Sequence, residues 1–320
     1  MNVQSLSQKI KDNISAVIVG KEDIIDLMMV CLFTRGHMLL EDVPGTGKTK
    51  LVRALARSID CTAKRIQFTP DLLPSDITGI RYFNMKTSEF EFVPGPVFTN
   101  IMLADELNRA TPKTQAGLLE CMEEQQATID GLTYRLADPF IVIATQNPIE
   151  NLGVFPLPEA ELDRFLVKTS MRYPTREESR EILARFGESD PLDSLRPVAT
   201  TAEIAAAIAE IPHVFIHPDL VDYIVSAVES TRTAEGVELG VSPRGAIALQ
   251  KAAKAFAAMS GRNFVIPEDV KRAAVPVLAH RLIMTGSARI RRGSDSAAIE
   301  EVLRTTPVPT EPQIFYSRNR

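Results

Sequence analysis

Residues 39–53 read LLEDVPGTGKTKLVR, a stretch that joins an apolar strand, a turn with two glycines and the start of a helix. Such a turn presents successive backbone N–H groups at a helix N-terminus, where the unpaired amides and the positive end of the helix dipole favour a polyphosphate. Lys48 would reach the β- and γ-phosphates of a nucleotide, and the Thr49 hydroxyl would hold Mg²⁺. The stretch therefore predicts a phosphate-binding loop.

The match to the strict phosphate-loop pattern is partial. The pattern G-x-x-x-x-G-K-[ST] requires glycine at position 42, where this chain has Asp42, so an ordinary strand-to-helix turn is the alternative on this fragment alone. The preceding elbow, VIVGKED, could sandwich an adenine ring through Ile18 and Val19, although such residues more often belong to the core. The residues assigned to the nucleotide are Val19, Gly45, Thr46, Gly47, Lys48, Thr49 and Lys50.

Composition describes an ordinary globular chain of roughly two domains, with 320 residues, 45% of them hydrophobic and 24% charged. The net charge of −5 weighs against a dedicated nucleic-acid surface, which depends on clustered Lys and Arg. Three separate cysteines without a C-x-x-C pattern indicate reduced thiols rather than a zinc site or a disulfide framework. The longest apolar run, residues 27–33, is too short for a membrane span, so we expect a cytoplasmic protein without a transmembrane segment.

Up to about residue 173, strand patterns alternate with helix patterns, which implies parallel β-α units. Apolar strands are predicted near 37–41, 64–68, 101–105, 140–148 and 165–169. Helices are predicted at 4–18, 21–33, 49–59 and 112–125. Two polar turns between alternating residues predict β-hairpins, and the second turn contains Asp130-Gly131, a strong hairpin signal.

From Thr175 the pattern becomes helical throughout, opened by the capping box TREE. Helices are predicted at 176–186, 202–210, 218–231, 243–259 and 267–284, and no strand is predicted among them. The expected organisation is an α/β nucleotide-binding core at 1–173, a smaller all-helical lid domain at 174–303 and a loosely held tail at 304–320.

Acidic and amide side chains stand at the ends of two predicted strands. Asp105 would orient a magnesium ion, and Glu106 would orient or deprotonate an attacking water. Asn147 could hold that water in line with the γ-phosphate. Each residue alone is also compatible with a helix cap or a solvent contact, but together with the phosphate-binding loop they indicate ATP hydrolysis.

These residues stand within motifs that resemble the MoxR family of AAA+ ATPases over essentially the whole chain. The motifs are VIVGKED, GHMLLEDVPGTGKT, IQFTPDLLPSDITG, FVPGPVF, LADELNRA, ATQNP, LPEAELDRF, VSPR and FVIPEDVKRAAVPVLAHRL. The resemblance implies a P-loop AAA+ core, with a parallel sheet flanked by helices, plus a helical lid. It also implies two β-hairpin inserts near 79–95 and 124–136, and Asp42 agrees with the family even though it departs from the strict loop pattern.

By the same resemblance, each candidate residue takes a role in ATP hydrolysis. Lys48 and Thr49 would be the Walker A pair, Asp105 and Glu106 the Walker B pair, Asn147 sensor one, Arg164 the arginine finger and Arg244 sensor two from the lid. We expect Arg244 to touch the γ-phosphate when the lid closes. Without the motifs, Arg164 and Arg244 would be read as solvated arginines or as partners of Glu161 and Asp163.

Other candidates carry weaker signals. Arg109 could act at a subunit interface, or it could pair with Glu106 or Glu120. His213 and His217 have a possible metal-ligand spacing, but a third ligand is absent and prolines flank both, which favours two loop histidines.

The resemblance implies a hexameric ring that remodels a protein client, often one with a von Willebrand A domain. Two other classes remain: a nucleic-acid-translocating module, and a scaffold that binds ATP with little turnover. The acidic balance and the lack of a nucleic-acid-binding motif weigh against the first. Glu106, Asn147 and Arg164 weigh against the second.

Overall fold

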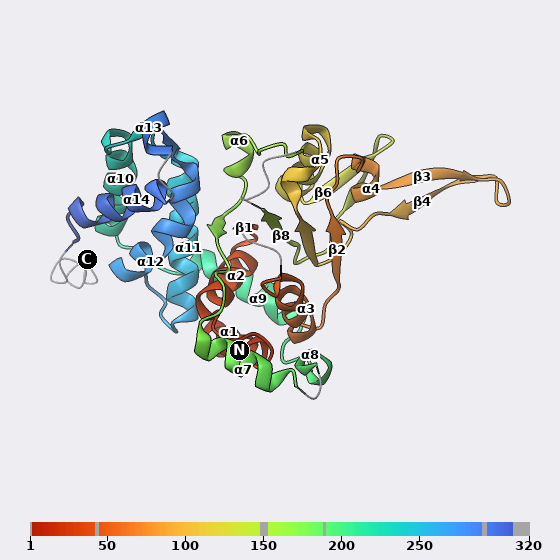
Figure 1. Cartoon of the computed structure of the whole chain (residues 1–320), viewed down its shortest axis with the longest axis horizontal. Coiled ribbons are helices and arrows are strands. Elements are labelled where there is room, and N and C mark those ends of the chain that lie inside the picture. Colours follow the sequence, from red (N-terminus) through yellow and green to blue (C-terminus); the bar gives the residue numbers. More distant parts are fainter. Residues whose placement is uncertain (1, 42–44, 148–152, 188–189, 290–292, 310–320) are drawn as a thin grey trace.

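The computed structural model describes residues 2–41, 45–147, 153–187, 190–289 and 293–309. Asp42, which departs from the strict loop pattern, lies outside the described residues. A central sheet separates a helical region on one side from a long hairpin that projects from the other side (Figure 1).

Five parallel strands form the central sheet, as the alternation of strands and helices predicted. Their order is β2-β5-β8-β1-β9, so the strand that leads into the phosphate-binding loop, β1, lies between β8 and β9. The strands are β1 (Met38–Glu41), β2 (Ala63–Gln67), β5 (Ile101–Asp105), β8 (Ile141–Gln146) and β9 (Val167–Thr169).

Helices and two hairpins surround this sheet. The helices are α1 (Val3–Ser15), α2 (Glu22–Thr34), α3 (Lys48–Ser58), α4 (Pro74–Thr78), α5 (Pro112–Glu124) and α6 (Glu159–Leu162). The antiparallel hairpins are β3 (Gly79–Asn84) with β4 (Glu89–Pro94), and β6 (Gln126–Ile129) with β7 (Leu132–Arg135). Asp130 and Gly131 both have positive φ in the second turn, as the Asp-Gly signal predicted.

The sheet is buried on both faces by two separate apolar clusters. In β1, Met38 and Leu40 join a cluster with α1, α2 and α3, whereas Leu39 joins a second cluster with α5. Continuous apolar strands suit a parallel sheet that is covered on both faces. Side chains that bind a ligand are therefore expected at the strand ends rather than on a sheet face.

The C-terminal region is predominantly helical, as predicted. Its helices are α7 (Arg176–Arg185), α8 (Pro191–Ser194), α9 (Thr201–Glu210), α10 (Pro218–Ser230), α11 (Pro243–Met259), α12 (Pro267–Leu278), α13 (Gly286–Arg289) and α14 (Ser294–Thr305). Thr175 forms the predicted capping box with Glu178 at the start of α7.

The predicted helix over 267–284 ends early, at Leu278. The chain continues through a 3₁₀ turn, η4 (Ala279–Arg281), into the short strand β11 (Ile283–Met284). Strand β11 pairs antiparallel with β10 (Val237–Leu239), so the expectation of no strand in this region was wrong. Strands of two or three residues carry no periodic signal, and only tertiary pairing reveals them.

The boundary of the predicted tail also differs. Helix α14 was not predicted as a helix, and it extends to Thr305, so the first two residues of the expected tail at 304–320 are helical. Ile299 and Val302 of α14 are buried, and this burial stabilises the C-terminal part of the helix. Residues 310–320 of the expected tail lie outside the described residues.

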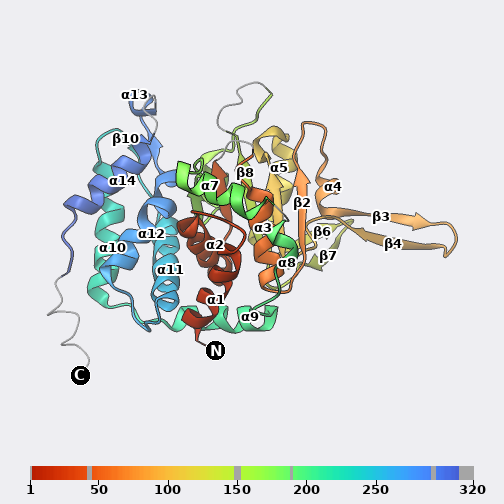
Figure 2. The same ribbon diagram turned by 60° about the horizontal axis from the view of Figure 1, so that its bottom comes forward.

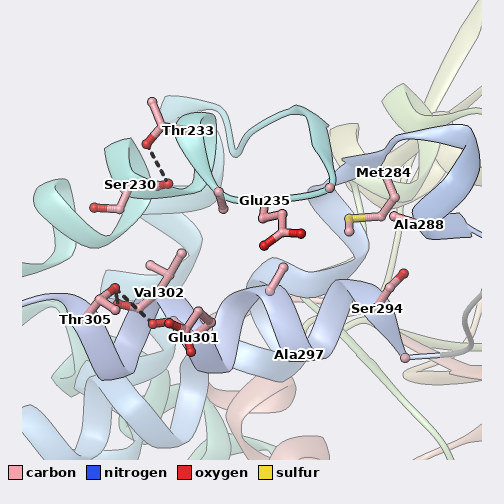
Figure 3. A pocket seen from close by; sticks show the side chains of 14 residues that line it. Ser230, Thr233, Glu235, Met284, Ala288, Ser294, Ala297, Glu301, Val302 and Thr305 are labelled. Carbon is pink, nitrogen blue, oxygen red and sulfur yellow. Dashed lines mark hydrogen bonds between the residues drawn. The ribbon is translucent and has the colours of Figure 1, made fainter.

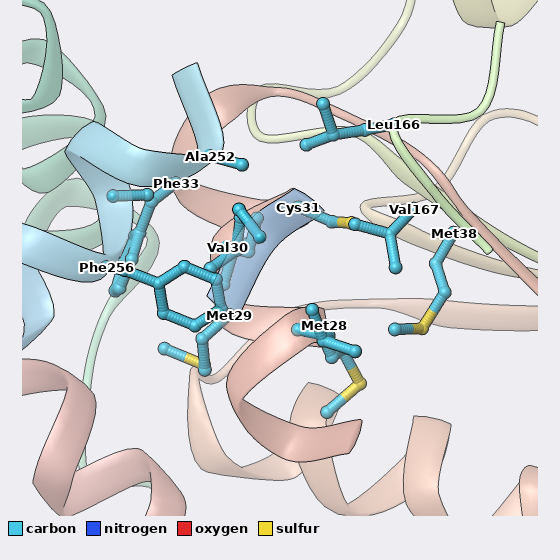
Figure 4. Close-up of a cluster of buried hydrophobic side chains, with 14 of the residues drawn as sticks. Met28, Met29, Val30, Cys31, Phe33, Met38, Leu166, Val167, Ala252 and Phe256 are labelled. Atoms are coloured by element: carbon cyan, nitrogen blue, oxygen red, sulfur yellow. The ribbon is translucent and has the colours of Figure 1, made fainter. Parts of the chain in front are cut away.

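Helix α2 connects the sheet to the C-terminal helices. All of its residues from Ile24 to Phe33 are buried. Among them, the apolar side chains from Met28 to Phe33 belong to one cluster with Ala252 and Phe256 of α11 and with Met38 and Val167 of the sheet (Figure 4). Both α1 and α2 lie beside α11 (Figure 2). One apolar cluster therefore continues across the boundary expected at residue 173. No helix in the described part of the chain is long and apolar enough to cross a membrane.

A buried histidine joins the sheet to α5. His37 Nδ1 accepts a hydrogen bond from the Val142 amide at 3.0 Å, and Nε2 lies 3.1 Å from the Met122 carbonyl oxygen, to which it donates. Burial lowers the pKa of His37 to about 4, although the Met122 carbonyl opposes this shift. His37 is therefore neutral in the folded protein at neutral pH.

We predict that the free energy of unfolding decreases as the pH falls from about 6.5 to about 4. In that window the unfolded chain binds a proton at His37 that the folded chain does not, so the cost at His37 alone reaches about 3 kcal/mol. Urea unfolding at several pH values measures the slope. His37→Asn should reduce this slope, whereas His213→Asn, at an exposed position, should not. An unchanged slope in His37→Asn would contradict the assignment.

Candidate functional site

The predicted phosphate-binding loop leads from β1 into α3. Gly45 and Gly47 have φ values of +90° and +93°, a region that residues with a Cβ rarely adopt. Gly47 is the N-cap of α3 and has no side chain with which to cap this helix. The amides of Lys48, Thr49 and Lys50 belong to the first turn, where backbone N–H groups have no acceptor within the helix and can bind an anion.

Asp105 is held firmly at the end of β5. This residue is 8% exposed, and its Oδ1 accepts a hydrogen bond of 2.6 Å from the Thr145 hydroxyl. Its Oδ2 accepts two hydrogen bonds from Arg65, of 3.1 Å from Nε and 2.7 Å from Nη2. The carboxylate is therefore oriented by groups on both neighbouring strands, β2 and β8.

Glu106 follows in a strained backbone conformation. Its φ of +56° is left-handed, which costs a residue with a Cβ about 1–2 kcal/mol. The Glu106 amide donates to the Thr145 hydroxyl oxygen at 2.9 Å, and Oε2 accepts from Arg109 Nη1 at 2.8 Å. Strained positions of this kind persist where the surroundings determine them fully, and they cluster at active sites.

Strand β8 brings the third element to the same edge of the sheet. Asn147 follows β8 directly and is 7% exposed. Since β8 lies between β5 and β1, the ends of all three strands meet at one edge. The structure thus groups the phosphate-binding loop with Asp105, Glu106 and Asn147, as expected for neighbouring parallel strands.

Sequence reasoning missed two residues of this group, Thr145 and Arg65. Thr145 stands two positions before Asn147, so the alternation of a strand already put both side chains on one face. Arg65 is two positions before Gln67, which pairs with Asp105 in the sheet. That pairing is tertiary information, so no pattern in the sequence could have identified the contact between Arg65 and Asp105.

A cavity of about 280 Å³ lies against the phosphate-binding loop. Gly45, Thr46, Gly47 and Lys50 line its polar side. Its apolar side is lined by Val17, Ile18 and Val19 of the elbow and by Pro174, Ile182 and Phe186. An apolar slot beside a helix N-terminus suits a flat aromatic base joined to phosphates, so the cavity supports the adenine interpretation of Ile18 and Val19. The α7 side of this slot was not predicted.

The Lys50 side chain lines this cavity and is held by two contacts. Its Nζ donates to Asp190 Oδ2 at 2.9 Å and lies 3.8 Å from the centre of the Phe186 ring. The hydrogen bond from Lys50 lowers the pKa of Asp190 below its usual value. The Lys50 side chain is thus engaged by residues beyond α7, whereas its backbone amide belongs to the first turn of α3.

The two candidate arginines lie together, at a different place. Arg164 Nη1 lies 3.1 Å from Glu123 Oε2, and Arg244 Nη2 lies 3.0 Å from Glu123 Oε1. Both line a second cavity, of about 260 Å³, which shares no lining residue with the first. Arg244 thus lines a cavity other than the one against the phosphate-binding loop, and its contact with the γ-phosphate on lid closure stays a prediction.

The remaining candidates have structural partners. Arg109 pairs with Glu106, one of the two carboxylates proposed for it, at 2.8 Å. His217 is the N-cap of α10, where Nδ1 accepts from the Asp219 amide at 3.2 Å. Within the described ranges, no group of three or more His, Cys, Asp or Glu residues could hold a metal ion. His213 itself ends the 3₁₀ turn η2 (Ile211–His213), so the two histidines lie at the ends of helical elements and not in an open loop.

A larger cavity, of about 610 Å³, lies in the C-terminal region between η3 (Thr231–Thr233) with the following residues 234–236 on one side and α14 on the other (Figure 3). It is lined mainly by small side chains, and its charged lining residues are Glu235 and Glu301. Two carboxylates repel a polyphosphate. The phosphate-binding loop is therefore the better nucleotide site despite its smaller cavity.

The residues at the loop also fit a magnesium ion. The Thr49 hydroxyl and the Asp105 carboxylate are hard oxygen donors, and Mg²⁺ is commonly held by one or two carboxylates together with substrate phosphates. Thr49 lies in the first turn of α3, and Asp105 ends the β5 strand.

Comparison with known proteins agrees with this geometry. The family model described as "ATPase family associated with various cellular activities (AAA)" matches residues 37–167, and the model described as "AAA lid domain" matches residues 229–302. A solved structure from Cytophaga hutchinsonii, provisionally assigned as an ATPase, superposes with a TM-score of 0.89 at 38% identity, covering 96% of each chain.

Relatives of known sequence extend over nearly the whole chain. The Bacillus subtilis protein YeaC, itself uncharacterized, is 48% identical over 97% of both chains. Chaperone MoxR1 of Mycobacterium tuberculosis is 42% identical over 92% of this chain and 80% of its own length. Protein MoxR of Paracoccus denitrificans is 32% identical over 92% of this chain and 94% of its own. The chain therefore belongs to the MoxR family of AAA+ ATPases.

Proposed function

We propose that this chain binds and hydrolyses Mg-ATP at the subunit interfaces of a cytoplasmic ring, and that it acts as a chaperone for a protein partner. One observation carries the ATPase part. The phosphate-binding loop at the N-terminus of α3 lies at the same edge of the sheet as Asp105 and Glu106, at the end of β5, and Asn147, directly after β8. Membership of the MoxR family supports the same activity.

Each residue at this edge has a defined task in hydrolysis. Lys48 would bind the β- and γ-phosphates, while Thr49 and Asp105 would hold Mg²⁺, which neutralises charge on those phosphates. Glu106 would orient the attacking water and accept its proton, and Asn147 would hold that water in line. The hydrogen bonds that the Asp105 carboxylate accepts from Arg65 and Thr145, and that the Glu106 carboxylate accepts from Arg109, would preorganise both groups for this work.

The position of the two arginines supports a site that is shared between subunits. Arg164 and Arg244 line a cavity apart from the loop of their own subunit, where Glu123 neutralises part of their charge. In a head-to-tail ring, each subunit offers one face to the complementary face of the next. Arg164 would then act as an arginine finger on the neighbour's γ-phosphate, in a ring that we expect to be hexameric.

The projecting β3–β4 hairpin supports a protein client. Met85 at its tip is 86% exposed, and Ile80, Phe83, Phe90 and Val93 are also exposed along its strands. Exposed apolar side chains in such number mark surfaces for protein contact, whereas duplex binding depends on clustered Lys and Arg. The chaperone name of the Mycobacterium tuberculosis relative supports a protein client, and a von Willebrand A domain in that client is an expectation from family membership alone.

The first test separates nucleotide binding from hydrolysis. Lys48→Ala should abolish ATP binding or weaken it severely, because it removes the cation that reaches the phosphates. Glu106→Gln should retain ATP binding but reduce turnover by about 10²–10⁴-fold, because the amide cannot accept the proton. Calorimetry and phosphate release measure the two effects, with Lys9→Ala, at an exposed position of α1, as the control. Normal turnover in Glu106→Gln would remove Glu106 from this role.

The second test concerns the base slot. Phe186→Ala should weaken ATP binding by about tenfold, because it removes apolar contact with the base, and should leave the binding of inorganic tripolyphosphate unchanged. Leu183→Ala is a matched control on the same helix, because Leu183 is 75% exposed and does not line the cavity. Equal losses for ATP and tripolyphosphate would mean that the slot does not hold the base.

The third test asks whether Arg164 acts on the neighbouring subunit. Lys48→Ala subunits keep the finger, and Arg164→Ala subunits keep the loop, so each parent alone has no complete site. In an equal random mixture, roughly a quarter of the interfaces should regain a complete site, and turnover should exceed that of both parents. Phosphate release from the mixture measures this recovery. An inactive mixture with proven subunit exchange would exclude a finger acting between subunits.

A further inference from the structure

Arg281 is a buried guanidinium between the lid and the segment that carries Arg164. It ends η4, and its side chain is only 4% exposed. Gly245 of α11 lies directly against it, because a Cβ at that glycine would be 3.1 Å from Arg281 Cδ. Burial lowers the pKa of Arg281, and the neighbouring Asp163 carboxylate opposes that shift. A charge in this position requires a nearly complete set of acceptors.

The acceptors come mainly from the backbone on both sides of Arg164. Arg281 Nε donates to Asp163 Oδ1 at 2.7 Å. Nη2 donates to the carbonyl oxygens of Asp163 at 3.1 Å and of Phe165 at 2.8 Å. Nη1 donates to the carbonyl oxygen of Leu166 at 3.3 Å and to that of Val277.

These contacts use the full capacity of the side chain. A guanidinium has five N–H donors in a fixed planar fork, and five oxygen contacts are present. Four of the five go to the segment 163–166, which connects α6 to β9 and whose amides donate to carbonyl oxygens of α6 and of His37. A lysine could keep the charge but could not reproduce the fork.

Asp163 joins this arrangement to the second lid arginine. Its Oδ1 accepts the hydrogen bond from Arg281 Nε, and its Oδ2 lies 3.6 Å from Arg244 Nε. Arg244 in turn shares Glu123 with Arg164. The lid thus contacts the backbone of the Arg164 segment through Arg281. It also contacts the Arg164 side chain indirectly, because Arg244 and Arg164 share Glu123.

We propose that Arg281 is a positioning residue for ATP hydrolysis in the neighbouring subunit. It fixes the conformation of the 163–166 backbone, and thereby the position from which Arg164 reaches the neighbouring subunit. Because Arg281 belongs to the lid, the position of the Arg164 finger also depends on the lid. This inference rests on the proposed function, in which Arg164 acts between subunits. Substitution of a residue that only stabilises the fold would reduce ATP turnover whichever subunit carried it. Substitution of Arg281 should reduce turnover only when it is carried by the subunit that donates the finger.

The test adds Arg281→Lys to one parent at a time in the mixture of Lys48→Ala and Arg164→Ala subunits. On the Lys48→Ala parent, which donates the finger, the change should reduce the recovered turnover by about tenfold or more, because a small misplacement of a catalytic group is costly. On the Arg164→Ala parent, which supplies only the loop, it should leave the recovered turnover unchanged. Thermal unfolding and ring assembly of each subunit are measured in parallel.

Arg262→Lys is the matched control. Arg262 is another lid arginine, which forms a two-pronged pair with Asp269 at 2.7 Å, far along the chain from Arg164. The effect of Arg262→Lys on the recovered turnover should be the same on either parent. If Arg281→Lys does not fold, Asp163→Asn replaces it, because the amide keeps the shape but removes the charge that receives Arg281.

Two outcomes overturn the inference alone: an equal loss on both parents, or no loss on either. Failure of the unmodified mixture is a separate result, because that mixture contains no change at Arg281. It would remove the intersubunit finger and, with it, any positioning role for Arg281 in the neighbour's site.

Discussion

Parallel pairing of β8 with both β1 and β5 is the constraint on which the rest of the site depends. Leu40 of β1 is in register with Thr145, and Leu103 of β5 is in register with Ile143 of the same strand. All three strands therefore end at one edge, where β1 continues into the glycine-bearing turn. No single local element could bring the loop, the two acids and the amide together, because each belongs to a different β-α unit.

Charge at this edge is arranged in pairs before any ligand binds. Asp105 has Arg65 and Thr145, and Glu106 has Arg109. Preorganised groups lose little freedom when they bind a ligand, so these pairs favour a fixed catalytic geometry over an adaptable one. Charged groups are also preorganised at the second cavity, where Glu123 and Asp163 orient arginines contributed by the core and the lid. The continuous apolar cluster around α2 gives both places a common rigid support.

Several features followed from the sequence because their physical causes are local. Glycine tolerates the positive φ at positions 45 and 47, which the spacing of the loop required. Apolar runs predicted the five strands, and the Asp130-Gly131 turn predicted its hairpin. The neighbouring positions of Asp105, Glu106 and Asn147 followed from the rule that parallel strands end at one edge of the sheet. The motifs also identified the family, which the relatives confirm.

Contacts between segments distant in the chain could not be derived in this way. The pair of Arg65 with Asp105 depends on strand register, and the cavity beside the phosphate-binding loop depends on α7 packing against the elbow at residues 17–19. The Arg244 motif did not predict that this side chain would lie beside Arg164, because the position of the lid is set by α11 packing on α1 and α2. Composition, periodicity and turn chemistry thus determined the main strands and helices of the core and the candidate residues of the site. Only the tertiary structure decided which charges meet, because the energy of an ion pair depends on distance and burial, and neither is encoded by neighbours in sequence.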